Sequence, residues 1–169
     1  MKILRCHHGP VPNTAESELH PFLRIVRRPF EEPDHVNLIV AANNGRQRGE
    51  LEIYANAEDL EVAAQRLAGF PANASDTFLW ELGSEKAEDR FAFYFRLRFW
   101  QVAPGGECGV ELRLNNNEEP PRREVSEFSF TTYPADINRL AELLREFSKL
   151  RHLTLEWTIT DGSLDDASR

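Results

Sequence analysis

The sequence predicts an α+β fold of two layers, in which a largely antiparallel sheet of about eight strands carries two amphipathic helices on one face. Three observations lead to this prediction. Residues 91–100 alternate between an apolar and an amphipathic row more strictly than any other stretch, as a half-buried strand does. Two other stretches place apolar residues at helical spacing, and two glycine-containing turns are typical of antiparallel hairpins.

The composition indicates one globular domain flanked by irregular ends. A chain of 169 residues with 41% hydrophobic residues has enough apolar surface for a single core. Residues 1–20 show no periodicity and predict an irregular N-terminal arm. Residues 21–160 form the expected domain, with halves at 21–83 and 91–160. Residues 161–169 are polar and predict a mobile tail.

The domain begins with a strand at residues 22–28 and a hairpin that spans residues 36–53. Apolar residues alternate on both arms of this hairpin, and the Asn-Gly pair at 44–45 supplies a turn. If that pair is the whole loop, Leu38 lies opposite Leu51, so that apolar side chains meet across the strands.

A helix is expected after the hairpin. Asn56 can cap it, and Asp59 stands three positions later, where a capping box needs an acceptor. Gly69 and Pro71 end the helix, and a strand follows at residues 78–82. The apolar positions of the helix are Leu60, Ala63, Ala64 and Leu67.

The strand at residues 91–100 presents two different faces. The apolar row consists of Phe91, Phe93, Phe95, Leu97 and Phe99, and the amphipathic row of Tyr94, Arg96, Arg98 and Trp100. A turn at Gly105-Gly106 returns the chain, and a two-residue loop there places Arg98 opposite Arg113. The apolar row needs a cover, whereas the amphipathic row can face water or a partner.

The last elements are a strand around residues 128–130, a second helix and a final strand at residues 153–159. Pro134 stands where the first turn of a helix tolerates proline. The apolar stripe of this helix is Ile137, Leu140, Leu143, Leu144 and Phe147.

The two halves resemble each other at an offset of 77 residues. The offset superposes identical residues at Asp59 and Asp136, Ala64 and Ala141, Leu67 and Leu144, Phe70 and Phe147, Thr77 and Thr154, and Trp80 and Trp157. Two explanations remain open at this point: an internal duplication, or the similar pattern that any strand–helix–strand unit shows.

Charge and cysteine content exclude several classes of protein. The formal net charge of −8 disfavours nucleic acid as a partner. Two cysteines, Cys6 and Cys108, do not make a disulfide framework or a four-cysteine zinc site. No apolar run is long enough for a bilayer, and the N-terminus lacks a signal-peptide core. We therefore expect a cytoplasmic protein without a membrane anchor.

No catalytic, metal or cofactor motif is recognisable. Cys6, His7 and His8 can each bind a metal, but consecutive residues in an irregular arm rarely converge on one ion. The other histidines lack metal-ligand spacing, and no serine stands in a nucleophile-elbow motif. We expect no metal site and no cofactor, and a binding function is favoured over an enzymatic one.

The amphipathic row is the candidate binding site. Tyr94, Arg96, Arg98 and Trp100 share a face with Arg113, and Arg, Tyr and Trp are the residue types that dominate binding hot spots. Acids on other strands, such as Glu52, Glu81 and Glu156, can offset the arginines. The face is therefore either a recognition surface or a solvated face with internal ion pairs.

The order of elements resembles that of small uncharacterised bacterial proteins, some of them grouped as immunity proteins of polymorphic or contact-dependent toxin systems. The resemblance covers residues 22–150 and includes Leu51-Glu52-Ile53-Tyr54 and Leu67-Ala68-Gly69-Phe70-Pro71. It implies a protein that binds and blocks a cognate toxin domain in the cytoplasm. The alternative is a small-molecule-binding or enzymatic domain with a pocket between helices and sheet, and a homodimer that covers the amphipathic face is a further option.

Overall fold

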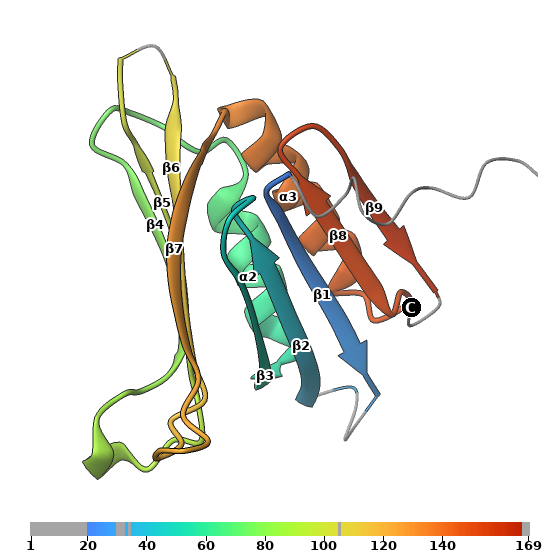
Figure 1. Ribbon diagram of the computed structural model, residues 1–169. Coiled ribbons are helices and arrows are strands. Elements are labelled where there is room, and N and C mark those ends of the chain that lie inside the picture. Colours follow the sequence, from blue (N-terminus) through green and yellow to red (C-terminus); the bar gives the residue numbers. More distant parts are fainter. Residues whose placement is uncertain (1–19, 30–32, 34, 105, 167–169) are drawn as a thin grey trace, which may run out of the picture.

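The described part of the chain folds into two antiparallel β-sheets with two α-helices beside them (Figure 1). The computed structural model describes residues 20–29, 33, 35–104 and 106–166. The α+β class, the antiparallel pairing and the two helices predicted from the sequence are confirmed. The strands divide into two sheets instead of forming one.

Parts of the expected ends lie outside the described residues. Residues 1–19 of the arm, including Cys6, His7 and His8, are among them, as are residues 167–169 of the tail.

One sheet has five strands in the order β3-β2-β1-β8-β9. Its strands are β1 (Phe22–Arg28), β2 (His35–Asn43), β3 (Arg48–Asn56), β8 (Thr154–Thr158) and β9 (Gly162–Asp165). The prediction of a mobile tail from residue 161 is therefore wrong for residues 162–165, which pair with β8 and pack Leu164 against the core. A four-residue strand with one apolar side chain is too short to show a pattern in the sequence.

The other sheet has four strands in the order β4-β5-β6-β7. They are β4 (Thr77–Gly83), β5 (Tyr94–Gln101), β6 (Cys108–Asn115) and β7 (Val125–Thr132). The expected apolar row of β5 is buried from Phe93 to Phe99, but Phe91 lies before the strand and is 51% exposed. A short 3-10 helix, η1 (Ala87–Asp89), occupies the connection between β4 and β5.

The helices α2 (Ala57–Leu67) and α3 (Pro134–Phe147) pack against each other and lie behind the five-stranded sheet in Figure 1. Each begins with a similar hydrogen bond. The backbone N–H of Asn56 donates to Asp59 at 2.8 Å, and that of Tyr133 donates to Asp136 at 3.3 Å. Each of these bonds satisfies one backbone N–H group at the start of its helix.

Both predicted hairpin registers are wrong by two residues. Leu38 pairs with Ile53, because the first loop has four residues, 44–47, closed by the side chain of Asn44. In the second hairpin Arg98 lies opposite Glu111, and Arg113 opposite Arg96. A shift of two leaves every side chain on its predicted face, so the division into inner and outer faces is unaffected.

The two halves share one topology. β3 and β7 begin at residues 48 and 125, α2 and α3 at 57 and 134, and β4 and β8 at 77 and 154, so each pair lies 77 residues apart. In each half a three-stranded meander precedes a helix, and the strand after the helix joins the sheet of the other half. This common path supports the duplication hypothesis over a chance similarity of pattern.

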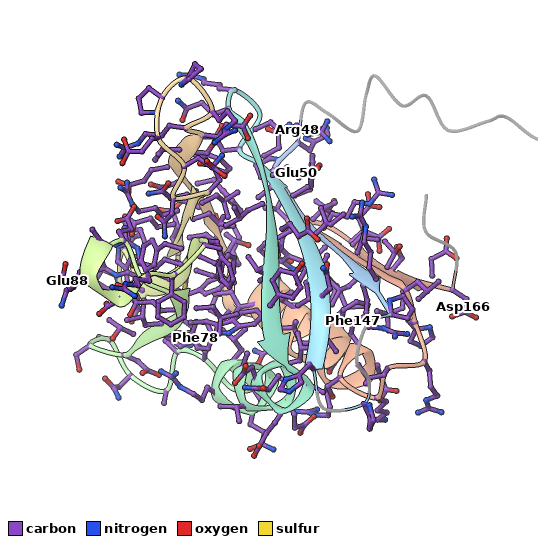
Figure 2. The ribbon with its side chains drawn as sticks, turned by 90° about the horizontal axis from the view of Figure 1, so that it is seen from below. Arg48, Glu50, Phe78, Glu88, Phe147 and Asp166 are labelled. Carbon is purple, nitrogen blue, oxygen red and sulfur yellow. The ribbon has the colours of Figure 1, made fainter. Side chains whose placement is uncertain are left out.

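The core fills the space between the sheets and the helices. Phe78 and Phe99 meet edge to face with ring centroids 5.7 Å apart, and Phe99 meets Trp157 in the same way at 6.5 Å. Figure 2 shows Phe78 and Phe147 among the packed side chains. At Gly49 of β3 an added Cβ would lie 2.7 Å from that of Ser126 in β7, so glycine permits the two sheets to approach each other here.

Candidate functional site

The outer face of the four-stranded sheet holds the predicted binding residues. Tyr94, Arg96, Arg98 and Trp100 occupy alternate positions of β5, and Arg113 of β6 lies opposite Arg96. Their exposure differs: Arg98 is exposed, Tyr94 is only 9% exposed, and the other three are intermediate. The structure thus brings these five residues together on one face but does not make them equivalent.

The two acids predicted for the site lie in different sheets. Glu81 of β4 pairs with Arg96 in the strand register and accepts a hydrogen bond from the Tyr94 hydroxyl at 2.5 Å. Glu52 of β3 belongs to the five-stranded sheet, where it accepts a hydrogen bond from Asn37 at 2.7 Å. The inclusion of Glu52 in the site is therefore wrong, because the sequence does not show that the strands divide into two sheets.

One end of the face is a network of ion pairs that we name the polar cluster. Arg96 bonds Glu111 at 2.9 Å and lies 3.5 Å from Glu127. Arg113 bonds Glu127 at 2.6 Å and holds both oxygens of Glu85 with Nε at 3.0 Å. The polar cluster consists of Glu81, Glu85, Tyr94, Arg96, Glu111, Arg113, Asn115 and Glu127.

The pairing shifts the pKa values of the cluster. Burial raises the pKa of Glu85, but hydrogen bonds from Arg113 and Asn115 outweigh it and hold this pKa below its ordinary value. The pKa of Arg113 is raised, chiefly by its hydrogen bonds to Glu85 and Glu127. Burial, followed by the hydrogen bond to Glu81, raises the pKa of Tyr94. At neutral pH Glu85 is therefore ionised and bonded to Arg113, and Tyr94 is protonated.

The other end of the face is apolar and cationic, and we name it the Trp100 patch: Leu79, Arg98 and Trp100. Arg98 lies opposite Leu79 in the strand register, and its guanidinium stands over the Trp100 ring at 5.0 Å from the centroid. Leu79 is 38% exposed. Within the described part of the chain, Arg98 forms no ion pair with a carboxylate, in contrast to Arg96 and Arg113.

Gly109 of β6 determines how Trp100 lies. The two residues are paired across the strands, and a Cβ at position 109 would stand 2.3 Å from the Trp100 ring. Only glycine leaves room for the indole to lie against the backbone. The ring is thus held flat on the sheet, with Arg98 above it and Leu79 nearby.

In the described ranges, the groups best suited to catalysis or metal binding are not assembled into a site. Cys108 is buried, and burial raises the pKa of its thiol, which disfavours the nucleophilic thiolate. Among the described residues, no three His, Cys, Asp or Glu side chains are grouped so that they could hold a metal ion. His35 bonds Asn56, and His152 bonds Asp166 at 2.7 Å.

An open hollow lies between the sheets near the start of α2. It has a volume of about 510 Å³ and is lined by Tyr54, Asp59, Glu81, Phe91 and Phe93, among others. This hollow is the one that corresponds to the pocket expected for the alternative small-molecule function. Its walls are mainly aromatic and aliphatic, and its two carboxylates are already bonded, Asp59 to the start of the helix and Glu81 to Tyr94.

Comparisons with known proteins add little. No family model matches the chain, and no curated protein sequence matches it. A solved structure described as that of the plant transcriptional regulator PBF-2 aligns over 75% of this chain and 72% of its own, with 11% identity and a TM-score of 0.42. A similarity of this size supports no inference about function. None of the helices in the described ranges is long and apolar enough to cross a membrane.

Sequence reasoning missed Glu85, Glu127 and Leu79. Glu127 precedes the inward-pointing Phe128, so its side chain points outward. It could have been placed on this face once β7 was known to pair with β6. Glu85 belongs to the charged loop between β4 and β5, and only the fold shows that it reaches Arg113. Leu79 could have been found as an apolar residue on the polar side of its strand.

Proposed function

We propose that this chain is a non-enzymatic binding protein and that the Trp100 patch is the centre of its recognition surface. The observation that carries the proposal is the contrast along β5. Arg96 is bound by two carboxylates, whereas Arg98 stands over Trp100 without an ion pair among the described residues. A flat indole, an arginine and an exposed leucine side by side have the composition of a binding hot spot.

The polar cluster supports the proposal by making the face rigid. Its bonds hold neighbouring strands β5, β6 and β7 together through their side chains, and a rigid surface loses less conformational freedom when a partner binds. The cluster also forms a polar rim beside the patch, as protein interfaces have around their apolar centre.

The proposed partner is a protein. A broad face without an enclosed cavity suits a protein surface better than a small molecule. The resemblance to immunity proteins makes a toxin domain the class of partner to test first. The net charge of −8 favours encounter with a basic domain, as many nucleic-acid-attacking toxin domains are. A second copy of the chain is the competing occupant of the same face.

The proposal is tested by quantitative affinity purification of the tagged chain from the cells that make it. We expect Trp100→Ala and Arg98→Ala each to weaken capture of a specific protein, by about 30-fold in affinity for a central anchor. Arg122→Ala is the matched control, because Arg122 is a highly exposed arginine in the loop before β7. Sedimentation of the purified chain distinguishes a foreign partner from a second copy.

Capture that is equal for the wild type and for both patch variants would contradict the proposed surface. Gly109→Ala gives an independent test. The added methyl group displaces the Trp100 ring, while the three residues of the Trp100 patch are themselves unchanged. It should weaken capture as Trp100→Ala does.

A further inference from the structure

The outer face of the five-stranded sheet carries a hollow that the proposed function does not use. Its volume is about 520 Å³, and side chains of β1, β2 and β3 line it. The lining residues that matter here are Arg24, Arg28, Ile39, Ala41, Arg48 and Glu50. Figure 2 shows Arg48 and Glu50 near each other on β3. The hollow lies in the other sheet from the Trp100 patch, so the two can be tested separately.

Positive charge is concentrated in this hollow although the whole chain is acidic. Arginines at positions 24, 27, 28 and 48 line it together with one acid, Glu50, among the described residues. Arg27 is engaged with backbone carbonyls of His152 and Leu150, and Arg28 lies 3.9 Å from Glu52. In a chain with 20 basic and 28 acidic residues, such a local excess marks a place where an anion is attracted.

Arg24 lines the hollow, and its guanidinium forms no ion pair with a carboxylate among the described residues. It stands in the middle of β1, between Ala41 of β2 and Glu156 of β8, and its Nε is buried without a hydrogen-bond partner in the described part of the chain. Glu156 is directly opposite, yet no ion pair joins the two side chains. A guanidinium that lines a hollow and has no carboxylate partner can hold an anion through charge-assisted hydrogen bonds from its accessible N–H groups.

The floor of the hollow is apolar. Val26, Ile39 and Ala41 line it, and Ala41 is 5% exposed. A simple inorganic ion would leave this surface uncovered, whereas an anion with a small apolar group would cover it. Glu50 at the edge is placed to accept a hydrogen bond from a hydroxyl or amino group of the same ligand.

We propose that this hollow binds a small organic anion, a phosphate monoester or a carboxylate, whose charged group is held by Arg24 and whose apolar group covers Ile39 and Ala41. The probes are phenyl phosphate, benzoate and inorganic phosphate, titrated at low ionic strength into the ¹⁵N-labelled full chain. We expect shifts of the amide signals of β1 and β2, with phenyl phosphate or benzoate binding more tightly than inorganic phosphate. The tighter of the two organic probes identifies the headgroup.

Variants locate the site. Arg24→Gln should weaken binding of the organic probe at least about tenfold, as expected for loss of a charge-assisted hydrogen bond, and Arg24→Lys should weaken it less. Glu156→Gln should strengthen binding, because it removes the negative charge opposite Arg24. Arg122→Gln is the charge-matched control in the other sheet's loop and should leave binding unchanged.

Three results would overturn the proposal: no response to either organic probe, the same affinity in Arg24→Gln as in Arg122→Gln, or tighter binding of inorganic phosphate than of both organic probes. The amide spectrum of each variant shows whether it is folded. If Arg24→Gln does not fold, Arg24→Lys takes its place in the comparison with Arg122→Gln. Trp100→Ala should not alter any of these affinities.

Discussion

Two tryptophans that lie 77 residues apart, Trp80 and Trp157, have different hydrogen bonding. Trp157 is fully buried and its indole N–H donates to the Asp136 carbonyl of α3 at 2.8 Å. Trp80 is 7% exposed, packs edge to face on Phe95, and its buried N–H has no partner among the described residues. Both are core residues, as the duplication hypothesis predicts, but only one of them has its polar group satisfied.

This difference gives the first prediction. Trp157→Phe should lower the free energy of unfolding more than Trp80→Phe, by at least about 1 kcal/mol. Trp157→Phe removes the hydrogen bond to the Asp136 carbonyl. Trp80→Phe removes an N–H that has no acceptor in the part of the chain that the structure describes. Urea denaturation of the two variants checks this, and equal losses would show that packing alone decides both.

The second prediction concerns Glu85 and pH. Its pKa is lowered in the folded state, so its bonds to Arg113 and Asn115 stabilise the fold above the pKa of the unfolded state and are lost as the pH falls through the folded pKa. At pH 7, Glu85→Gln should cost about 1 kcal/mol, and the difference from wild type should shrink below roughly pH 4. Unfolding curves measured from pH 7 to pH 3 test this. A difference that stays constant over that range would contradict the ionic role.

At the scale of elements, the sequence predicts faces well and registers poorly. Strand faces follow from a period of two, so Phe95 and Arg96 could be assigned to opposite sides before the fold was known. Register depends on loop length, and the side chain of Asn44 closes a four-residue loop where Asn-Gly alone predicts two residues. The candidate face was therefore predictable, while its ion pairs were not.

β9 is the element that the sequence did not indicate. Its backbone pairs with β8, and the backbone N–H of Leu153 donates to the Asp165 carbonyl at 2.9 Å. β9 is the edge strand next to β8, and it places Leu164 against the core. Since an added Cβ at Gly162 would lie 2.5 Å from a methyl group of Leu143, β9 also runs close to α3.

The third prediction follows from this packing. Truncation after Asp161 should lower the free energy of unfolding by roughly 1–3 kcal/mol, the value expected for exposing one large aliphatic side chain. The binding of organic anions should persist, because Arg24, Ile39 and Ala41, which we propose to contact the anion, lie in β1 and β2. A truncated chain as stable as the full chain would show that β9 is not held in solution.

At the scale of the whole molecule, each sheet contains strands from both halves of the chain. β4 belongs to the first half but pairs with β5, and β8 belongs to the second half but pairs with β1. This exchange could not be read from the sequence, because apolar patterns do not state which strands are neighbours. It makes each half depend on the other for one strand and for much of its core.

The fourth prediction tests this dependence. Fragments 1–90 and 91–169, divided in the loop between β4 and β5, should each be unfolded alone, because each lacks a strand that its main sheet requires. Mixed in equal amounts they should restore the dispersed amide spectrum of the intact chain. A fragment that folds alone would contradict the exchange of strands.

The central claim is that two arginines on one face of β5 have different roles: Arg96 stabilises the sheet and Arg98 is left for a partner. The most direct test is the free energy of unfolding of Arg96→Ala and Arg98→Ala in the absence of any partner. Arg96→Ala should lose about 1–3 kcal/mol, because Glu111 loses its arginine partner and Glu127 keeps only Arg113. Arg98→Ala should change the free energy of unfolding by less than about 0.5 kcal/mol. Equal losses for the two variants would mean that Arg98 serves the fold as Arg96 does, and would contradict the claim.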